Sequence, residues 1–129
     1  METLTNWEQT IDIEMIESIA GPKPEFEVIF LDSKRKRHKL IFNRVWDMRY
    51  SVENASIMRF CEFRKHLPAN IIDNGIYVVK ESEYIKYFKY QVDETLPTDE
   101  LTHYILCDRT DTTIDILVDM HKPVLVSIE

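Results

Sequence analysis

The 129-residue sequence contains only two glycines, two cysteines and no long apolar run, and each shortage excludes a class of protein. Phosphate-binding loops need several residues without a Cβ atom, so two glycines exclude them. Cys61 and Cys107 are far apart among apolar neighbours. This favours two buried free thiols over a disulfide and indicates a reducing cytoplasm. No stretch reaches the roughly 20 apolar residues that span a bilayer, and the acidic N-terminus does not have the basic start of a signal peptide.

Catalytic and metal-binding motifs are also missing. No Gly-x-Ser-x-Gly is present. His103 and Cys107, four residues apart on one strand, would lie about 13 Å from each other, too far for a catalytic dyad. The four histidines are widely separated, and the aspartates between Asp108 and Asp119 do not follow the spacing of a calcium loop. We therefore predict a non-enzymatic protein with no cofactor and no metal site, although carboxylates from distant elements could still converge.

What the chain does contain is the composition of an ordinary globular domain. Apolar residues make up 44% and charged residues 30%, so a filled core is expected. At this length we expect a single domain, residues 1–129, because two independent cores are rarely built from so few residues. The patterning predicts an α+β fold, with a mainly antiparallel sheet of about seven strands and two or three helices.

The first half of the chain changes its apolar period at a proline-rich break. Isoleucines at three-residue spacing predict a short helix in the stretch up to Ala20. Alternation then predicts a hairpin of strands 25–32 and 36–43, with an extended continuation over 44–50. Residues 53–66 fit a helical stripe about as well as a pair of strand faces, and their composition slightly favours a helix.

The second half is dominated by short strands around one clear helix. A loop is predicted over 67–74 and a strand over 76–80. Ser82 has the position of an N-cap for a helix over 83–92. Three more strands, separated by polar turns, are predicted as an antiparallel meander over 102–107, 113–118 and 123–128.

The uneven charge of the chain indicates where a partner would bind. The net charge is −7, and the segment from Asp93 to Asp119 holds eight acids and a single base, Arg109. Asp115 should face solvent, because it alternates with two isoleucines. An acidic surface favours a basic protein partner, while solubility alone is the alternative interpretation. The predicted partner-binding residues are Asp108, Asp111, Asp115, Tyr87 and Tyr90.

Two other charged groups have both a functional and a structural interpretation. Asp47, Arg49 and Glu53 form a predicted charged cluster, which is either a groove or an ordinary salt-bridge network. The basic run over 34–39 could contact an acidic partner, or it could protect a hairpin edge from aggregation. The run has no interleaved aromatics and the chain is acidic overall, so neither nucleic acid nor a membrane is predicted as a partner.

Short motifs in the chain resemble small cytoplasmic domains of Gram-positive bacteria. The resemblance covers the segment from Tyr77 to Ile85, the segment from His103 to Leu106, and the segment from Ile114 to Leu117, with Val45 to Arg49 before them. Some proteins of this kind look like immunity proteins that neutralise toxins. The resemblance implies neither catalysis nor any particular site residue.

We therefore predict a non-enzymatic protein-interaction module, with a toxin-neutralising immunity protein as its most concrete form. A basic partner would be steered by the acidic surface. The alternative is a structural or accessory subunit that forms a homodimer through a sheet edge or through the tyrosine-bearing helix. A third class is a small ligand-binding domain or hydrolase, whose pocket would hold Arg49 and Glu53.

Overall fold

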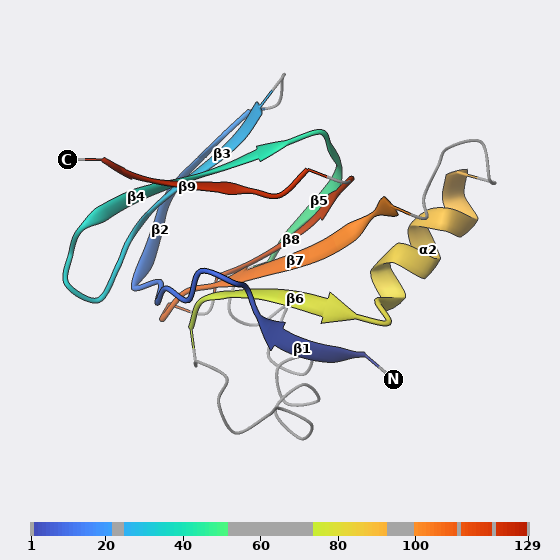
Figure 1. Ribbon diagram of the computed structural model, residues 1–129, viewed down its shortest axis with the longest axis horizontal. Coiled ribbons are helices and arrows are strands. Elements are labelled where there is room, and N and C mark those ends of the chain that lie inside the picture. The colour runs from blue at the N-terminus through green and yellow to red at the C-terminus, as the bar shows by residue number, and fades with distance from the viewer. Residues whose placement is uncertain are drawn as a thin grey trace.

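The computed structural model describes residues 2–21, 25–51, 74–92, 100–110, 112–119 and 121–128. In this part of the chain there are nine strands in two antiparallel sheets and one helix of ten residues (Figure 1). The predicted α+β fold with two or three helices is therefore wrong, because the described residues are mainly strand. Residues 53–66, which fit either a helix or strands, lie outside the described residues, and so does most of the loop predicted over 67–74.

The larger sheet has five strands in the order β1-β6-β7-β8-β5. These are β1 (Thr3–Asn6), β6 (Ile76–Lys80), β7 (Thr102–Cys107), β8 (Thr113–Val118) and β5 (Val45–Ser51). All neighbouring strands in the sheet pair antiparallel. The strands predicted over 76–80, 102–107 and 113–118 are confirmed, and β5 confirms the extended continuation of the hairpin.

The smaller sheet has four strands in the order β2-β3-β4-β9. These are β2 (Met15–Ala20), β3 (Glu25–Leu31), β4 (Arg37–Asn43) and β9 (Val124–Ile128). The hairpin predicted over 25–32 and 36–43 is confirmed as β3 and β4. The predicted three-strand meander is wrong at its last member, because β9 leaves β8 and pairs with β4 in the other sheet.

The helix predicted near the N-terminus is wrong, and a β-bulge in β2 explains its apolar spacing. Ile16 pairs with Phe30 and Ile19 pairs with Val28, but the register shifts between Ile16 and Ser18. A bulge adds one residue to a strand, so the alternation of faces slips by one position. Both isoleucines therefore pack against the core although they are three residues apart. That interval is also the spacing of a helical stripe.

The main core lies between the two sheets. Phenylalanines dominate the inner face of the smaller sheet, and branched aliphatic residues dominate the inner face of the larger one. The buried members include Phe26, Val28, Phe30, Leu40 and Phe42 on one side, and Tyr104, Leu106, Ile114, Ile116 and Val118 on the other. Since side chains alternate along a strand, the residues between these members point away from the core.

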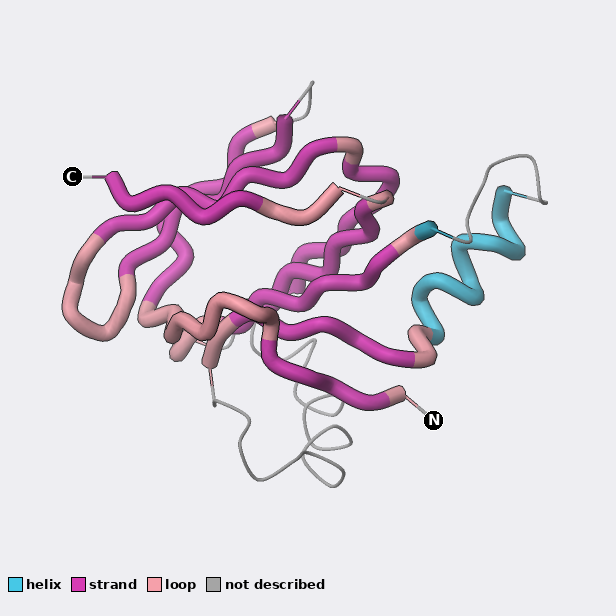
Figure 2. Tube along the Cα trace, viewed as in Figure 1, coloured by secondary structure: helices cyan, strands magenta, loops and turns pink. Residues whose placement is uncertain are grey.

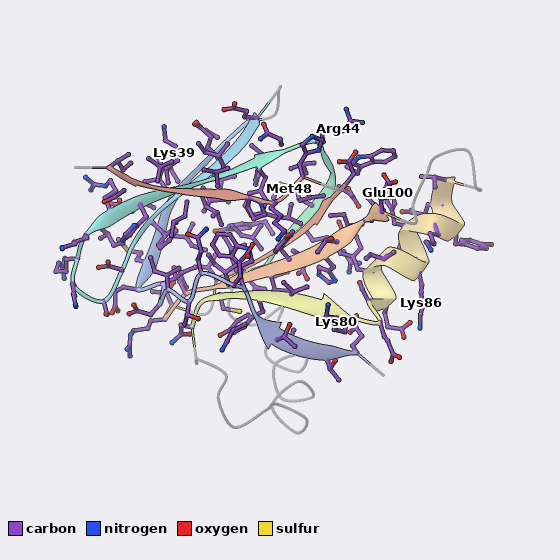
Figure 3. The ribbon with its side chains drawn as sticks, in the orientation of Figure 1. Lys39, Arg44, Met48, Lys80, Lys86 and Glu100 are labelled. Atoms are coloured by element: carbon purple, nitrogen blue, oxygen red, sulfur yellow. The ribbon has the colours of Figure 1, made fainter. Side chains whose placement is uncertain are left out.

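Two crossings between the sheets are tied together at one point. Arg44, where β4 passes into β5, has a positive φ of 56° and lies in the outer part of the fold (Figure 3). Asp119, where the chain leaves β8 toward β9, accepts a hydrogen bond from Nε of Arg44 at 2.6 Å. The backbone N–H of Asp119 also lies 3.4 Å from the carbonyl oxygen of Arg44. The pair therefore joins two of the three places where the chain changes sheet, from β4 to β5 and from β8 to β9.

The helix α2 (Glu83–Val92) lies at the end of the five-stranded sheet, where Figure 2 shows it beyond the strands. The predicted N-cap is confirmed, because Ser82 Oγ accepts the backbone N–H of Ile85 at 3.0 Å. Tyr84 and Phe88 on its inner side pack with Leu117 of β8. No helix among the described residues has the length and apolarity needed to cross a membrane.

Candidate functional site

The outward face of β7 and β8 is buried as completely as the inward face. Its six residues are His103, Ile105, Cys107, Thr113, Asp115 and Leu117, and each is at most 3% exposed. The prediction that Asp115 faces solvent is therefore wrong, since only 1% of it is exposed. A buried carboxylate must find hydrogen-bond partners, because leaving it unsatisfied costs several kcal/mol.

The partners of Asp115 form a chain of three buried polar groups, which we call the Ser-His-Asp relay. Asp115 Oδ1 lies 2.6 Å from His103 Nε2, and His103 Nδ1 lies 2.7 Å from Ser82 Oγ. Ser82 Oγ also accepts the N–H of Ile85, so its own proton is available for Nδ1. The Nε2 proton of His103 then points to Asp115. Three elements, β8, β7 and α2, are joined by this relay.

Serine, histidine and aspartate are also the residue types of a hydrolytic triad, but this arrangement fits an anchor better. A nucleophilic hydroxyl must be free to reach a substrate carbonyl. Ser82 is 5% exposed, and its oxygen is held by the first turn of α2. The ring of Tyr84 meets His103 edge-on, with 5.2 Å between the ring centroids. The relay therefore fixes the N-terminus of α2 to the sheet.

A second polar group lies beside the relay and centres on Tyr84. Its hydroxyl donates to Asp47 Oδ2 at 2.8 Å, and the guanidinium of Arg49 stands 3.6 Å from its ring centroid. Burial raises the pKa of the Tyr84 hydroxyl far above its ordinary value, and the hydrogen bond to Asp47 raises it further. Asp47 and Arg49 of the predicted charged cluster thus lie close together, because both contact Tyr84 of α2. Glu53, the third member, lies outside the described residues.

The predicted acidic partner surface does not form at Asp108 or at Asp115. Asp108 is 1% exposed. Its Oδ1 accepts hydrogen bonds from the backbone N–H groups of Thr110 and Thr112, and its Oδ2 accepts the N–H of Ile16. It therefore closes the turn between β7 and β8 and ties that turn to β2. Asp111 lies outside the described residues.

The two predicted tyrosines, by contrast, lie at the surface of α2. Tyr87 is 58% exposed and Tyr90 is 84% exposed. They are three residues apart, so they are neighbours on one side of the helix. Lys86 and Gln91 lie beside them and are also exposed. This outward side of α2, which we call the tyrosine face, is opposite the side that packs on the sheet.

Sequence reasoning missed the relay, although its members occur in the motifs that carry the resemblance. Ser82, His103 and Asp115 lie one in each of the segments 77–85, 103–106 and 114–117. Each residue has an ordinary local role as a cap, a strand residue or a surface acid. Only the pairing of β7 with β8, together with the turn into α2, brings them into contact.

No cation site is formed by the described residues, since no three histidine, cysteine or acidic side chains among them converge. Comparison of the chain with protein-family models, curated proteins and solved structures finds no significant match. The resemblance to small bacterial domains therefore stays a prediction.

Proposed function

We propose that the protein is a non-enzymatic binding module, and that a basic protein partner docks on the tyrosine face of α2. The observation that carries this proposal is the exposure of Tyr87 at 58% and Tyr90 at 84%, side by side on one helix. Tyrosine is enriched at protein interfaces because its ring offers apolar area and its hydroxyl offers a hydrogen bond. A ring face also attracts the lysine and arginine side chains that a basic partner carries.

The inner contacts of α2 support this role because they hold the helix in place before a partner arrives. The N-terminus of α2 is bonded to the sheet through Ser82 and His103, and Phe88 packs with Trp46 at 6.4 Å between ring centroids. A surface that is already ordered loses little conformational freedom on binding. The buried relay thus contributes to affinity without touching the partner.

The charge of the molecule supports a basic partner rather than an acidic one. The net charge is −7, and opposite charge accelerates association. Near the tyrosine face, Glu83 forms an ion pair with Lys86 at 3.2 Å, which offsets the positive charge of that lysine. Glu100 is exposed and lies beside α2 (Figure 3). A toxin-neutralising protein in the cytoplasm is the concrete form of this proposal.

The test uses the purified chain as bait in lysate and culture medium of its host. We expect one basic protein to be captured at low salt and released at high salt. Titration of that protein should then give a Kd at least ten times weaker for Tyr87→Ala/Tyr90→Ala than for the unmodified chain, equivalent to about 1.4 kcal/mol.

The matched control is Tyr50→Ala, because Tyr50 is 54% exposed but lies on β5. This variant should bind the partner as tightly as the unmodified chain does. Equal binding by the double variant and the control would exclude the tyrosine face as the docking surface. Failure to capture any basic protein would count against the function itself.

A further inference from the structure

The side chain of Trp7 places a polar atom inside the main core. Trp7 is 3% exposed, and its Nε1 is a fully buried nitrogen that has no hydrogen-bond partner among the described residues. An indole nitrogen can only donate a hydrogen bond, so Trp7 needs an acceptor. Nearly all buried polar groups in proteins are hydrogen-bonded, either to other protein groups or to a molecule held between them. The unpaired nitrogen therefore indicates a site where a bound molecule supplies the acceptor.

Strand register places Trp7 and Tyr104 on the two sides of β6. The backbone N–H of Trp7, just after β1, donates to the carbonyl oxygen of Ile76 at 3.0 Å and so continues the β1–β6 ladder. On the other side of β6, Tyr104 of β7 pairs with Val78 (Figure 1). Both aromatic residues belong to the main core, and among its described buried members only these two have a polar side-chain atom. They therefore flank β6 on the side that faces the smaller sheet.

The hydroxyl of Tyr104 has the properties of a second partner for a bound oxygen. Burial raises the pKa of this hydroxyl, and the charge of Glu8 raises it further, so the hydroxyl stays protonated at neutral pH. A protonated hydroxyl can both donate and accept a hydrogen bond. Glu8 is the residue after Trp7. Its effect therefore places the Tyr104 hydroxyl within electrostatic reach of the segment that carries the indole.

The surroundings of Trp7 select a small, uncharged molecule. The residues that form the main core in the described part of the chain are all uncharged, and an ion buried without a counter-ion is costly. Each buried member of this core is at most 6% exposed, which leaves room only for a small molecule. Next to Trp7, Glu8 lies 3.4 Å from Lys122, and these side chains are 56% and 74% exposed. So exposed an ion pair is weak, and its opening gives a small molecule access.

We propose that Trp7 Nε1 and the Tyr104 hydroxyl bind the oxygen atom of one small neutral molecule between the two sheets. The oxygen belongs either to a water molecule or to a small alcohol or carbonyl compound, because both offer an uncharged acceptor. A buried water typically makes two to four hydrogen bonds, and these two side chains supply the first two. This inference does not depend on the function proposed for α2. The helix packs on the outward side of the five-stranded sheet, at Leu117, whereas Trp7 lies on its inward side.

The first test is a high-resolution crystal structure of the unmodified chain. We expect one ordered oxygen atom within about 3.2 Å of both Trp7 Nε1 and the Tyr104 hydroxyl. Tyr104→Phe keeps the ring but removes the second partner, so the ordered oxygen should be lost while the fold stays the same. An indole that donates to a protein acceptor, or density that shows no oxygen within this distance, would overturn the inference. An oxygen that stays in the Tyr104→Phe variant would exclude Tyr104 as its partner.

The second test uses NMR to distinguish water from an organic ligand. The chain has two tryptophans, and Trp46 is the matched control because its side chain is hydrogen-bonded to Asp119. Trp46→Phe removes one indole N–H signal and so assigns the other to Trp7. A saturable shift of the Trp7 signal with butan-1-ol, without a shift of the Trp46 signal, would identify an organic oxygen as the ligand. No shift, together with the ordered oxygen in the crystal, would identify water. An equal shift with butanoate would overturn the inference of an uncharged ligand.

Discussion

On the outward faces of the two sheets, burial is the reverse of what the side chains' polarity would suggest. On the five-stranded sheet, the outward side of β7 and β8 carries His103 and Asp115, and both are fully buried. On the four-stranded sheet, the outward side of β9 carries Val124 and Val126, and both are exposed. The outward face of β7 and β8 is covered although it includes polar side chains, while the two valines on the outward face of β9 meet solvent. The comparison shows that in this fold the covering of a sheet, rather than its own polarity, decides which face becomes buried.

The strands themselves alternate in the same way on both sheets. In β8 the sequence around Asp115 is Thr-Ile-Asp-Ile-Leu-Val, and in β9 it is Val-Leu-Val-Ser-Ile. Ile114 and Ile116 face the core, and so does Leu125. What differs is that α2 packs over part of the outward side of β8. Four variants can break or sharpen this contrast, and they are taken from the largest expected effect to the smallest.

The largest effect is expected for Asp115→Ala. Removal of the carboxylate leaves the Nε2 proton of the fully buried His103 without this acceptor at 2.6 Å and leaves a cavity. Loss of one partner from a buried polar pair typically destabilises by about 3 kcal/mol. Urea unfolding should show this loss, whereas Glu25→Ala, at an exposed position of β3, should change stability by less than about 0.5 kcal/mol. Equal effects of the two variants would contradict the burial of the relay.

Ser82→Ala should have a smaller but clear effect, because Ser82 serves both the helix and the relay. The variant loses the cap on the N–H of Ile85 and the contact with His103 Nδ1. Loss of an N-cap costs about 1 kcal/mol, and loss of the hydrogen bond between Ser82 and His103 adds to it. Ser82→Thr keeps the hydroxyl and should recover most of this loss in thermal or urea unfolding. A threonine variant as unstable as the alanine variant would mean that the hydroxyl is not the stabilising group.

A pH effect is expected at the turn that joins β3 and β4. The hydrogen bond from His38 lowers the pKa of Asp32 below its ordinary value of 3.8, and the backbone N–H groups of Lys36 and Lys34 add to this. Because the unfolded chain binds this proton more tightly, the contribution is complete above about pH 4 and is lost as pH falls through the lowered pKa. Asp32→Asn should therefore show a smaller fall in unfolding free energy between about pH 4 and pH 2. An unchanged pH profile would exclude Asp32 as a contributor.

The smallest effect is expected for Val126→Thr, on the outward face of β9. Valine and threonine have similar shapes and strand preferences, and Val126 is 38% exposed. The free energy of unfolding should change by less than about 0.5 kcal/mol. A loss of several kcal/mol would mean that this face is packed within a single chain, and the contrast between the two sheets would then disappear.

The sequence was sufficient for those elements whose signals are local. Residues 25–32 and 36–43 form a hairpin because the alternation and the turn chemistry at Asp32 agree. The helix after Ser82 begins where the cap predicts. The helix expected near the N-terminus fails because the bulge in β2 mimics helical spacing. Local patterns therefore identified the β3–β4 hairpin and the strands β6, β7 and β8, but they missed β1 and β2.

The features that sequence reasoning missed depend on contacts between distant segments. Asp115 looks like a surface acid from its neighbours, and Asp108 looks like a turn acid open to solvent. Their burial depends on His103, on α2 and on the N–H of Ile16, which lies 92 residues before Asp108. Asp47 and Arg49 were predicted to belong to one charged cluster with Glu53, but Tyr84, which contacts both, is more than 30 positions away. The spacing of residues within one segment cannot predict contacts between side chains of distant segments.

The way the chain alternates between the two sheets has a consequence for how fast the protein folds. Thr3 pairs with Lys80 and Arg37 pairs with Ile128, so each sheet joins segments that are far apart in the sequence, 77 and 91 residues respectively. Pairings over such long separations require large loops to close before they are stabilised, which slows folding relative to helical proteins of similar size. We expect refolding in milliseconds to seconds. The β3–β4 hairpin, whose turn is short and local, should form before the strands that enclose it.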